Sequence, residues 1–218
     1  MKRPKILVIN AALNENDHSF SDPIHTLLQK SDSKVQHYKD IKSIKDTKGY
    51  DAIIISGQPP DDESYTNKSI TRDYPWIKDV EVPLFGFCGG HQIIAVSHGA
   101  EIINDKEKEP KGYFAAYAEN GHIDDPIFKG IRFGRCNAFI VYNKHKDSVT
   151  LPEDFDILAS TDRCRNALMK HKTKLIYGAQ FHPEDPGYYR RSHGINQKSN
   201  QDSDTVVVNF ENIVLGQL

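Results

Sequence analysis

One cysteine stands among glycines in the stretch PLFGFCGGHQ, residues 83–92. The apolar run before Cys88 predicts a strand, and the apolar residues after it recur at helical spacing. The cysteine would then occupy a tight strand-to-helix turn, which lifts a nucleophilic side chain off the edge of a sheet. The start of the helix would favour the thiolate, and the N–H of Gly89 could stabilise an oxyanion. The pattern is compatible with a cysteine nucleophile, but taken alone it is more typical of a small buried cysteine in a glycine turn.

A histidine and a carboxylate lie two positions apart in the later stretch YGAQFHPE, residues 177–184. Pro183 disfavours helical backbone for His182, so this segment is expected to be extended. Side chains at positions i and i+2 of an extended chain point to the same side, which would let Glu184 orient the His182 imidazole. A thiolate nucleophile needs such a base and such an orienting group. A surface turn without any catalytic role is the other interpretation of this motif.

Predicted strands and helices alternate along the first half of the chain, and they could bring the two motifs together. They lie at residues 5–10, 23–29, 34–39, 50–57, 82–87 and 89–98. This alternation is typical of a parallel α/β sheet, whose sites lie at the carboxyl ends of the strands. Asp22 is the expected cap of the helix at 23–29, because a proline follows it at the first helical position. Residues 61–81 carry no strong helix pattern.

The second half of the chain carries short strand-like segments joined by turns. They lie at residues 112–118, 138–143, 155–161, 166–171 and 175–181. We expect these segments to extend the same sheet, partly in antiparallel fashion. A polar stretch at 190–204 predicts a loop, and residues 205–217 predict a closing amphipathic helix.

The composition is that of an ordinary globular protein. The 218 residues suit a single domain, and a net charge of −2 gives no electrostatic reason to bind nucleic acid or an anionic membrane. The apolar runs are too short to cross a bilayer, and no signal-peptide pattern follows the N-terminus. The three cysteines are Cys88, Cys136 and Cys164, and their spacing argues against a disulfide framework and favours a cytoplasmic location. We expect no metal, because Cys88 and His91 lack a second pair of ligands nearby.

The stretch GFCGGHQ, followed later by QFHPE, resembles the motifs of the class I (triad-type) glutamine amidotransferases. The resemblance extends from KILVIN through FHPE. It implies a flavodoxin-like fold, one amidotransferase domain over residues 1–218, and a catalytic triad of Cys88, His182 and Glu184. The thiolate would attack the side-chain amide of L-glutamine and release ammonia, and water would then hydrolyse the glutamyl thioester. His182 would shuttle the protons, and no cofactor is implied.

The resemblance also assigns the oxyanion hole. The N–H groups that form it would belong to Gly89 and to the turn at Gly57. The sequence departs from the family at SGQPP, where Gln58 stands in place of a second glycine. If that position needs a positive φ, Gln58 is costly there, and the oxyanion hole is built differently.

Two further residues are implied to lie near the substrate. Gln92 matches a family glutamine beside the bound glutamine. Residues 141–161 resemble the segment H-x-D-x-V-x-x-L-P of free-standing, GMP-synthase-like amidotransferase domains, and His145 and Asp147 fit that pattern. In relatives the backbone just before this segment lines the glutamine pocket. A solvated loop histidine without a role is the other interpretation of His145.

The ammonia would need an acceptor. The sequence contains no phosphate-binding loop, so synthetase activity would lie on a separate subunit. The main alternative is a γ-glutamyl hydrolase that uses the same triad on γ-glutamyl amines or peptides. A non-catalytic regulatory protein on this fold is the third hypothesis, and Gln58 is its only support.

Overall fold

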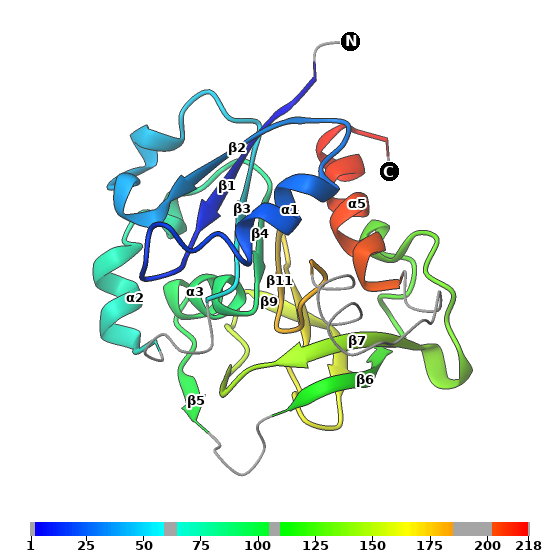
Figure 1. The fold of residues 1–218 in the computed structure, drawn as a ribbon. Coiled ribbons are helices and arrows are strands. Elements are labelled where there is room, and N and C mark those ends of the chain that lie inside the picture. Colours follow the sequence, from blue (N-terminus) through cyan, green and yellow to red (C-terminus); the bar gives the residue numbers. More distant parts are fainter. Residues whose placement is uncertain (1–2, 59–64, 105–109, 185–201, 218) are drawn as a thin grey trace.

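A mixed β-sheet runs through the molecule (Figure 1). The computed structural model describes residues 3–58, 65–104, 110–184 and 202–217. Within these residues the sheet has nine strands, in the order β2-β1-β3-β4-β11-β10-β9-β6-β7. The parallel part consists of β2 (Asp32–His37), β1 (Lys5–Asn10), β3 (Ala52–Ile55), β4 (Leu84–Phe87) and β11 (Ile176–Ala179).

The remaining strands of this sheet pair in antiparallel fashion. They are β10 (Leu168–His171), β9 (Phe155–Thr161), β6 (Lys111–Ala118) and β7 (Ala138–Lys144). A separate antiparallel pair is formed by β5 (Ile102–Asn104) and β8 (Asp147–Val149). The predicted α/β class, with a parallel sheet and antiparallel additions from the second half, is confirmed.

Helices cover both faces of the parallel strands (Figure 1). One face packs against α1 (Ser21–Leu27) and α5 (Asp202–Val214), and the other against α2 (Asn67–Asp73) and α3 (Gly89–Ser97). Short 3-10 turns are η1 (Tyr38–Asp40), η2 (Ile44–Thr47), η3 (Ile77–Asp79), η5 (Pro126–Phe128) and η6 (Arg135–Asn137).

Strand β1 shows why the parallel strands read as continuous apolar runs. Ile6 and Val8 belong to the core cluster beneath α1 and α5, whereas Leu7 and Ile9 belong to the cluster beneath α2 and α3. A parallel strand covered on both faces must be apolar at every position, so the alternation typical of a half-exposed strand is absent.

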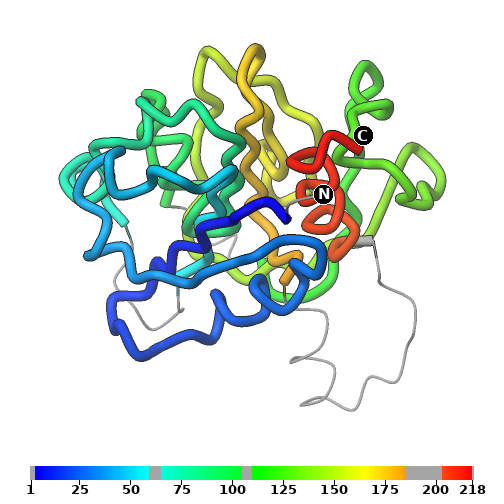
Figure 2. The backbone as a smooth tube through the Cα atoms, turned by 90° about the horizontal axis from the view of Figure 1, so that it is seen from above, coloured from blue at the N-terminus to red at the C-terminus, as the bar shows by residue number. Residues whose placement is uncertain are grey.

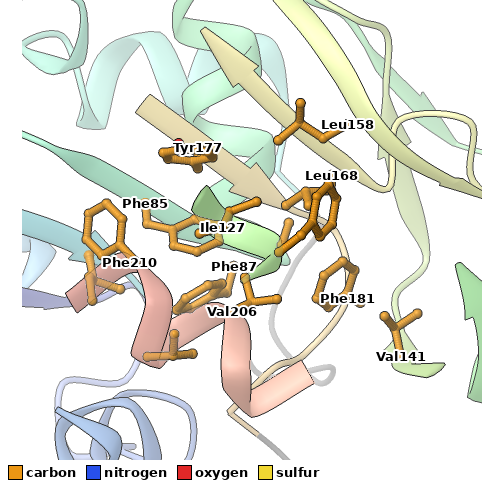
Figure 3. Packing of buried hydrophobic residues seen from close by; sticks show 14 of the residues in the cluster. Phe85, Phe87, Ile127, Val141, Leu158, Leu168, Tyr177, Phe181, Val206 and Phe210 are labelled. Atoms are coloured by element: carbon orange, nitrogen blue, oxygen red, sulfur yellow. The ribbon is translucent and has the colours of Figure 1, made fainter. Parts of the chain in front are cut away.

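Aromatic side chains fill the core beneath α5. Figure 3 shows Phe210 of the helix beside Phe85 of β4, and their ring centroids are 5.3 Å apart. Tyr177 of β11 lies 5.8 Å from the Phe85 ring. This packing fixes β4 and β11 as neighbours, which matters because each leads into one of the two sequence motifs.

The C-terminal helix lies beside the N-terminal part of the chain (Figure 2). The N–H of Lys30, which follows α1, donates a 2.8 Å hydrogen bond to Oε1 of the buried Glu211 in α5. The predicted closing helix is thus confirmed, and it begins at Asp202. Of the predicted loop at 190–204, residues 190–201 lie outside the described residues.

One local prediction was wrong, and one helix was not predicted. Helix α1 begins at Ser21, so Asp22 lies inside its first turn and does not cap it. Residues 67–73 form helix α2, which the apolar pattern did not predict. The missed signal is a capping box, in which Thr66 and Ser69 each accept the other's backbone N–H.

Candidate active site

Cys88 occupies the turn between β4 and α3, as predicted. Its φ of 47° and ψ of −102° lie in a region that residues other than glycine rarely adopt. Its N–H donates to the Ala179 carbonyl over 2.7 Å, and its carbonyl accepts from the Gln92 N–H over 3.1 Å. Hydrogen bonds to a neighbouring strand and to the following helix therefore hold the cysteine in a strained backbone conformation, as at other functional turns.

Glycines around Cys88 allow two backbones to cross closely. A Cβ atom at Gly86 would lie 2.3 Å from the Gly90 carbonyl oxygen. A Cβ atom at Gly90 would lie 2.3 Å from the carbonyl oxygen of Ile55 in β3. Only glycine fits at these two positions, so the glycines let the start of α3 rest on the ends of β3 and β4.

The sheet brings the second motif to Cys88. Strand β11 pairs in parallel with β4, with Ala179 opposite Phe87. The residues that follow both strands therefore leave the sheet at the same edge. A Cβ atom at Gly57 would lie 3.2 Å from His182 Cε1 and 3.5 Å from Cys88 Cβ, so the glycine after β3 also faces this place.

His182 and Glu184 form a buried pair. The His182 Nδ1–H donates to Glu184 Oε1 over 2.8 Å, and both side chains are 1% exposed. His182 Nε2 lies 3.2 Å from the backbone carbonyl oxygen of Lys144. A carbonyl only accepts hydrogen bonds, so Nε2 carries hydrogen in this arrangement, and with Glu184 ionised Nδ1 carries one too and the ring is an imidazolium.

Electrostatics around His182 favour the same protonation state. Burial by itself lowers the pKa of His182, but the Cys88 thiolate and the Glu184 carboxylate outweigh burial and raise it well above its ordinary value. The charges of the two neighbours can therefore hold an imidazolium beside a Cys88 thiolate.

Gln92 and His145 meet at one backbone carbonyl. Gln92 Nε2 donates to the Asp147 carbonyl over 2.9 Å, and His145 Nδ1 donates to the same oxygen, also over 2.9 Å. Burial lowers the pKa of His145 to about 4, which keeps the ring neutral at pH 7. The structure thus brings both predicted substrate residues close to the elbow, the turn between β4 and α3 that carries Cys88. Both side chains are held there by their hydrogen bonds to the Asp147 carbonyl.

Gln58 does not carry the predicted backbone strain. It is not among the described residues other than glycine that have a positive φ. Its backbone N would lie 3.1 Å from a Cβ at Gly89, so the SGQ turn faces the start of α3. The premise that Gln58 must adopt a left-handed conformation does not hold in this structure.

Two contacts of the site were missed at the sequence level. One is the Lys144 carbonyl beside His182, which no side-chain pattern could reveal. The other is Gln180, whose carboxamide lies beside the Cys88 sulfur. Gln180 does have a signal, since it precedes His182 by two positions in an extended segment and so points to the same side.

No group of three or more His, Cys, Asp or Glu side chains that could hold a metal ion is found in the part of the chain that the structure describes. His91 is fully buried, and a Cβ at Gly178 would lie 2.6 Å from its Nδ1. Its ring packs against the β11 backbone and takes no part in the His182–Glu184 pair.

The fold and the site place the protein among α/β enzymes with a cysteine at a strand-to-helix turn. Residues 12–200 match the family described as glutamine amidotransferase class-I, and the chain belongs to this family. It is a glutamine amidotransferase enzyme, and it is similar to proteins named as one subunit of a glutamine-hydrolyzing GMP synthase. With the Methanosarcina barkeri protein it shares 33% identity over 187 residues, which is 84% of this chain and 89% of that one. With the Methanocaldococcus jannaschii protein it shares 36% over 147 residues, 67% of this chain and 69% of that one.

Solved structures agree on the fold. A Thermoplasma acidophilum protein provisionally described as one subunit of GMP synthase has a TM-score of 0.74 at 24% identity, covering 99% of this chain and 96% of that one. A glutamine amidotransferase from Thermotoga maritima has a TM-score of 0.65 at 15% identity, covering 100% of this chain and 95% of that one. Among the described residues, no helix is long and apolar enough to span a membrane.

Proposed function

We propose that the protein hydrolyses the side-chain amide of glutamine with Cys88 as nucleophile, His182 as general acid and base, and Glu184 as the group that orients the histidine. The observation that carries the proposal is the buried His182–Glu184 hydrogen bond of 2.8 Å at the sheet edge where Cys88 stands. The chain, in this proposal, acts as one amidotransferase domain over residues 1–218.

The proposed reaction has two steps. The thiolate attacks the amide carbon, and the carbon–nitrogen bond breaks as the imidazolium gives its Nε2 proton to the leaving nitrogen, which departs as ammonia. Water then attacks the glutamyl thioester while neutral His182 accepts a proton from it, and the sulfur leaves as thiolate beside the restored imidazolium. For the first transfer the Nε2–H must turn from the Lys144 carbonyl to the leaving nitrogen.

In this proposal, the N–H groups of Gly89 and of the turn at Gly57 stabilise the oxyanion that forms when the thiolate attacks the amide carbon. Support comes from the position of Gly57 against Cys88 and His182, and from that of Gly89 at the first residue of α3. A preorganised N–H beside a developing oxyanion contributes strongly to such reactions. Gln92 and His145 are proposed to border the substrate through the Asp147 segment.

We further propose that the ammonia passes to a separate synthetase subunit, working in the cytoplasm, that aminates a nucleotide in the manner of GMP synthase. The similarity to relatives named as one subunit of a glutamine-hydrolyzing GMP synthase supports this assignment. The test is glutamine-dependent product formation by the protein mixed with an ATP-dependent GMP synthase subunit that lacks its own amidotransferase. Failure to make GMP with glutamine, while added ammonium ions still support the reaction, would contradict the pairing.

Labelling with a glutamine-like diazo ketone tests the nucleophile. We expect peptide mass spectrometry to find the label on Cys88, and Cys88→Ala to lose both labelling and ammonia release. Unlabelled Cys88, with no ammonia released from glutamine in the presence of the synthetase subunit, would refute the mechanism. Faster turnover of γ-glutamyl amides than of glutamine would replace the proposal with a γ-glutamyl hydrolase.

A further inference from the structure

The carboxamide of Gln180 lies directly beside the proposed nucleophile. Gln180 follows β11, is fully buried, and its backbone N–H donates to the Ala167 carbonyl over 2.9 Å. Its side-chain Nε2 lies 3.8 Å from the Cys88 sulfur, within the longer reach of a hydrogen bond to sulfur. The next residue, Phe181, points into the core in Figure 3, so alternation along the extended chain turns Gln180 and His182 together toward the site.

The neighbouring groups determine which end of the Gln180 carboxamide faces the sulfur. The Asp147 carbonyl can only accept, so Gln92 must present its NH₂ group to it over 2.9 Å. The same NH₂ group lies 3.4 Å from Gln180 Oε1, which must therefore be an oxygen. The NH₂ group of Gln180 is thereby left facing Cys88, and the chain of bonds from Asp147 through Gln92 and Gln180 excludes the flipped carboxamide.

We propose that Gln180 stabilises the thiolate of Cys88 and aims it, as a catalytic residue in addition to the three of the proposed triad. This inference rests on the proposed function, because it takes Cys88 as the attacking group. A thiolate accepts an N–H hydrogen bond better than a thiol does, so the Gln180 contact favours the charged form. His182 supplies the balancing positive charge, and Gln180 supplies a neutral donor that stays in place when the imidazolium gives up its proton.

The link to Gln92 adds a second consequence. Gln92 is the proposed substrate residue, and its NH₂ group is shared between the Asp147 carbonyl and Gln180. A ligand that draws this NH₂ group away would leave the Gln180 oxygen without its donor. Binding of a ligand in the glutamine pocket would therefore change how the Gln180 NH₂ group is oriented toward the Cys88 sulfur. The hydrogen bond between Gln92 and Gln180 couples the two.

The test measures the alkylation of Cys88 by iodoacetamide as a function of pH. The variants are Gln180→Met, which removes the donor at similar volume, and Gln180→Glu, which keeps the shape and places an acceptor beside the sulfur. Peptide mass spectrometry separates Cys88 from the exposed Cys136. Burial raises the pKa of the Cys164 thiol to about 12, so this cysteine stays unreactive in the range of the assay.

We expect Gln180→Met to move the alkylation profile about one pH unit to the alkaline side, which lowers the rate at neutral pH roughly tenfold, and Gln180→Glu to move it further. Asn209→Leu is the matched control. Asn209 is a buried carboxamide that donates to the carbonyls of Ile127 and Lys129, each over 2.8 Å, and has no contact with Cys88 among the described residues. Its loss should lower the melting temperature and leave the Cys88 profile unchanged.

A Gln180→Glu profile that overlays that of the wild type, in protein with an unchanged circular dichroism spectrum, would overturn the proposal. So would an Asn209→Leu shift equal to that of Gln180→Met, since the effect would then follow from general loosening. The assay reports the sulfur and does not depend on glutamine turnover. A shifted profile without glutaminase activity would therefore contradict the proposed function alone, and glutaminase activity with an unshifted profile would contradict only the role of Gln180.

Discussion

His182 is held as an imidazolium by acceptors at both ring nitrogens. The Glu184 carboxylate faces Nδ1 and the Lys144 carbonyl faces Nε2, while the Cys88 sulfur lies close to the same carbonyl. An enzyme gains most when its charges are in place before the substrate arrives, because no reorganisation is then needed during the reaction. The buried carboxylate is the group that gives this arrangement its fixed negative charge.

Replacing Glu184 by glutamine keeps the shape of the side chain and removes the charge. Glu184→Gln should lower the fraction of thiolate–imidazolium pair, because the carboxylate helps to raise the His182 pKa. We expect kcat/KM for glutamine to fall roughly a hundredfold. Steady-state ammonia release in the presence of the synthetase subunit measures this.

Glu211→Gln is the control for the loss of a buried carboxylate. Glu211 is 1% exposed and accepts the Lys30 N–H in the contact between α5 and α1. This variant should unfold at a lower temperature and keep its kcat/KM. Equal losses of activity in both variants would show that Glu184 acts only through stability.

At the scale of elements, the elbow depends on how closely α3 approaches β3 and β4. The strained φ of 47° at Cys88 persists because the flanking glycines let the start of the helix rest on the strand ends. A methyl group between these backbones would lift the helix and move the cysteine away from the oxygens and nitrogens that surround it.

Gly90→Ala should therefore be severely destabilising. Its Cβ would meet the Ile55 carbonyl at 2.3 Å, a backbone atom that cannot move aside without disturbing β3. We expect a loss of about 3 kcal/mol or more in the free energy of unfolding, measured by urea denaturation. Gly121→Ala is the control, since nothing lies within 4 Å of its added Cβ, and a change within about 0.5 kcal/mol is expected there. Similar losses in both variants would contradict the close approach.

The local sequence pattern predicted the strand, turn and helix around Cys88. The features that it did not predict depend mostly on contacts between residues far apart in the sequence. The apolar run, the cysteine and the helix predicted over residues 89–98 could be read directly, because strand, turn and helix signals are all local there. The pairing of β4 with β11 could not be predicted, since no local signal fixes which strands become neighbours. The contact of the Lys144 carbonyl with His182 could not be predicted, because every residue type has a backbone carbonyl and the sequence gives no sign of which one lies in the site. Helix α2 was missed because its evidence is a cap and not an apolar stripe.

For the whole molecule, two buried histidines connect the stability of the fold to pH. Burial lowers the pKa of His91 to about 3, and contact with the Gly178 backbone offsets only part of this. Burial also lowers the pKa of His145 to about 4. Both rings stay neutral in the folded protein, whereas in the unfolded chain a histidine takes up a proton below about pH 6.5. Stability from these residues is therefore fully present above pH 6.5 and is lost as the pH falls toward 4 and then 3.

His182 acts in the opposite direction. Its folded pKa is raised, so its contribution is fully present below about pH 6.5 and is lost only as the pH rises through the folded value. Among the histidines, stability is lost toward acid at those whose folded pKa is lowered. Of these, His91 is fully buried.

His91→Leu should make the protein less sensitive to acid. In the wild type, the His91 ring alone should cost about 2 kcal/mol of unfolding free energy between pH 7 and pH 5, because the unfolded chain binds a proton that the fold excludes. The variant removes that difference whatever its stability at pH 7, so the slope of stability against pH is the quantity to measure, by urea denaturation at several pH values. Ile93→Val, two positions along the same buried helix, should lower stability by about 1 kcal/mol at every pH and keep the wild-type slope. A His91→Leu slope equal to that of the wild type would show that the ring already takes up its proton inside the fold.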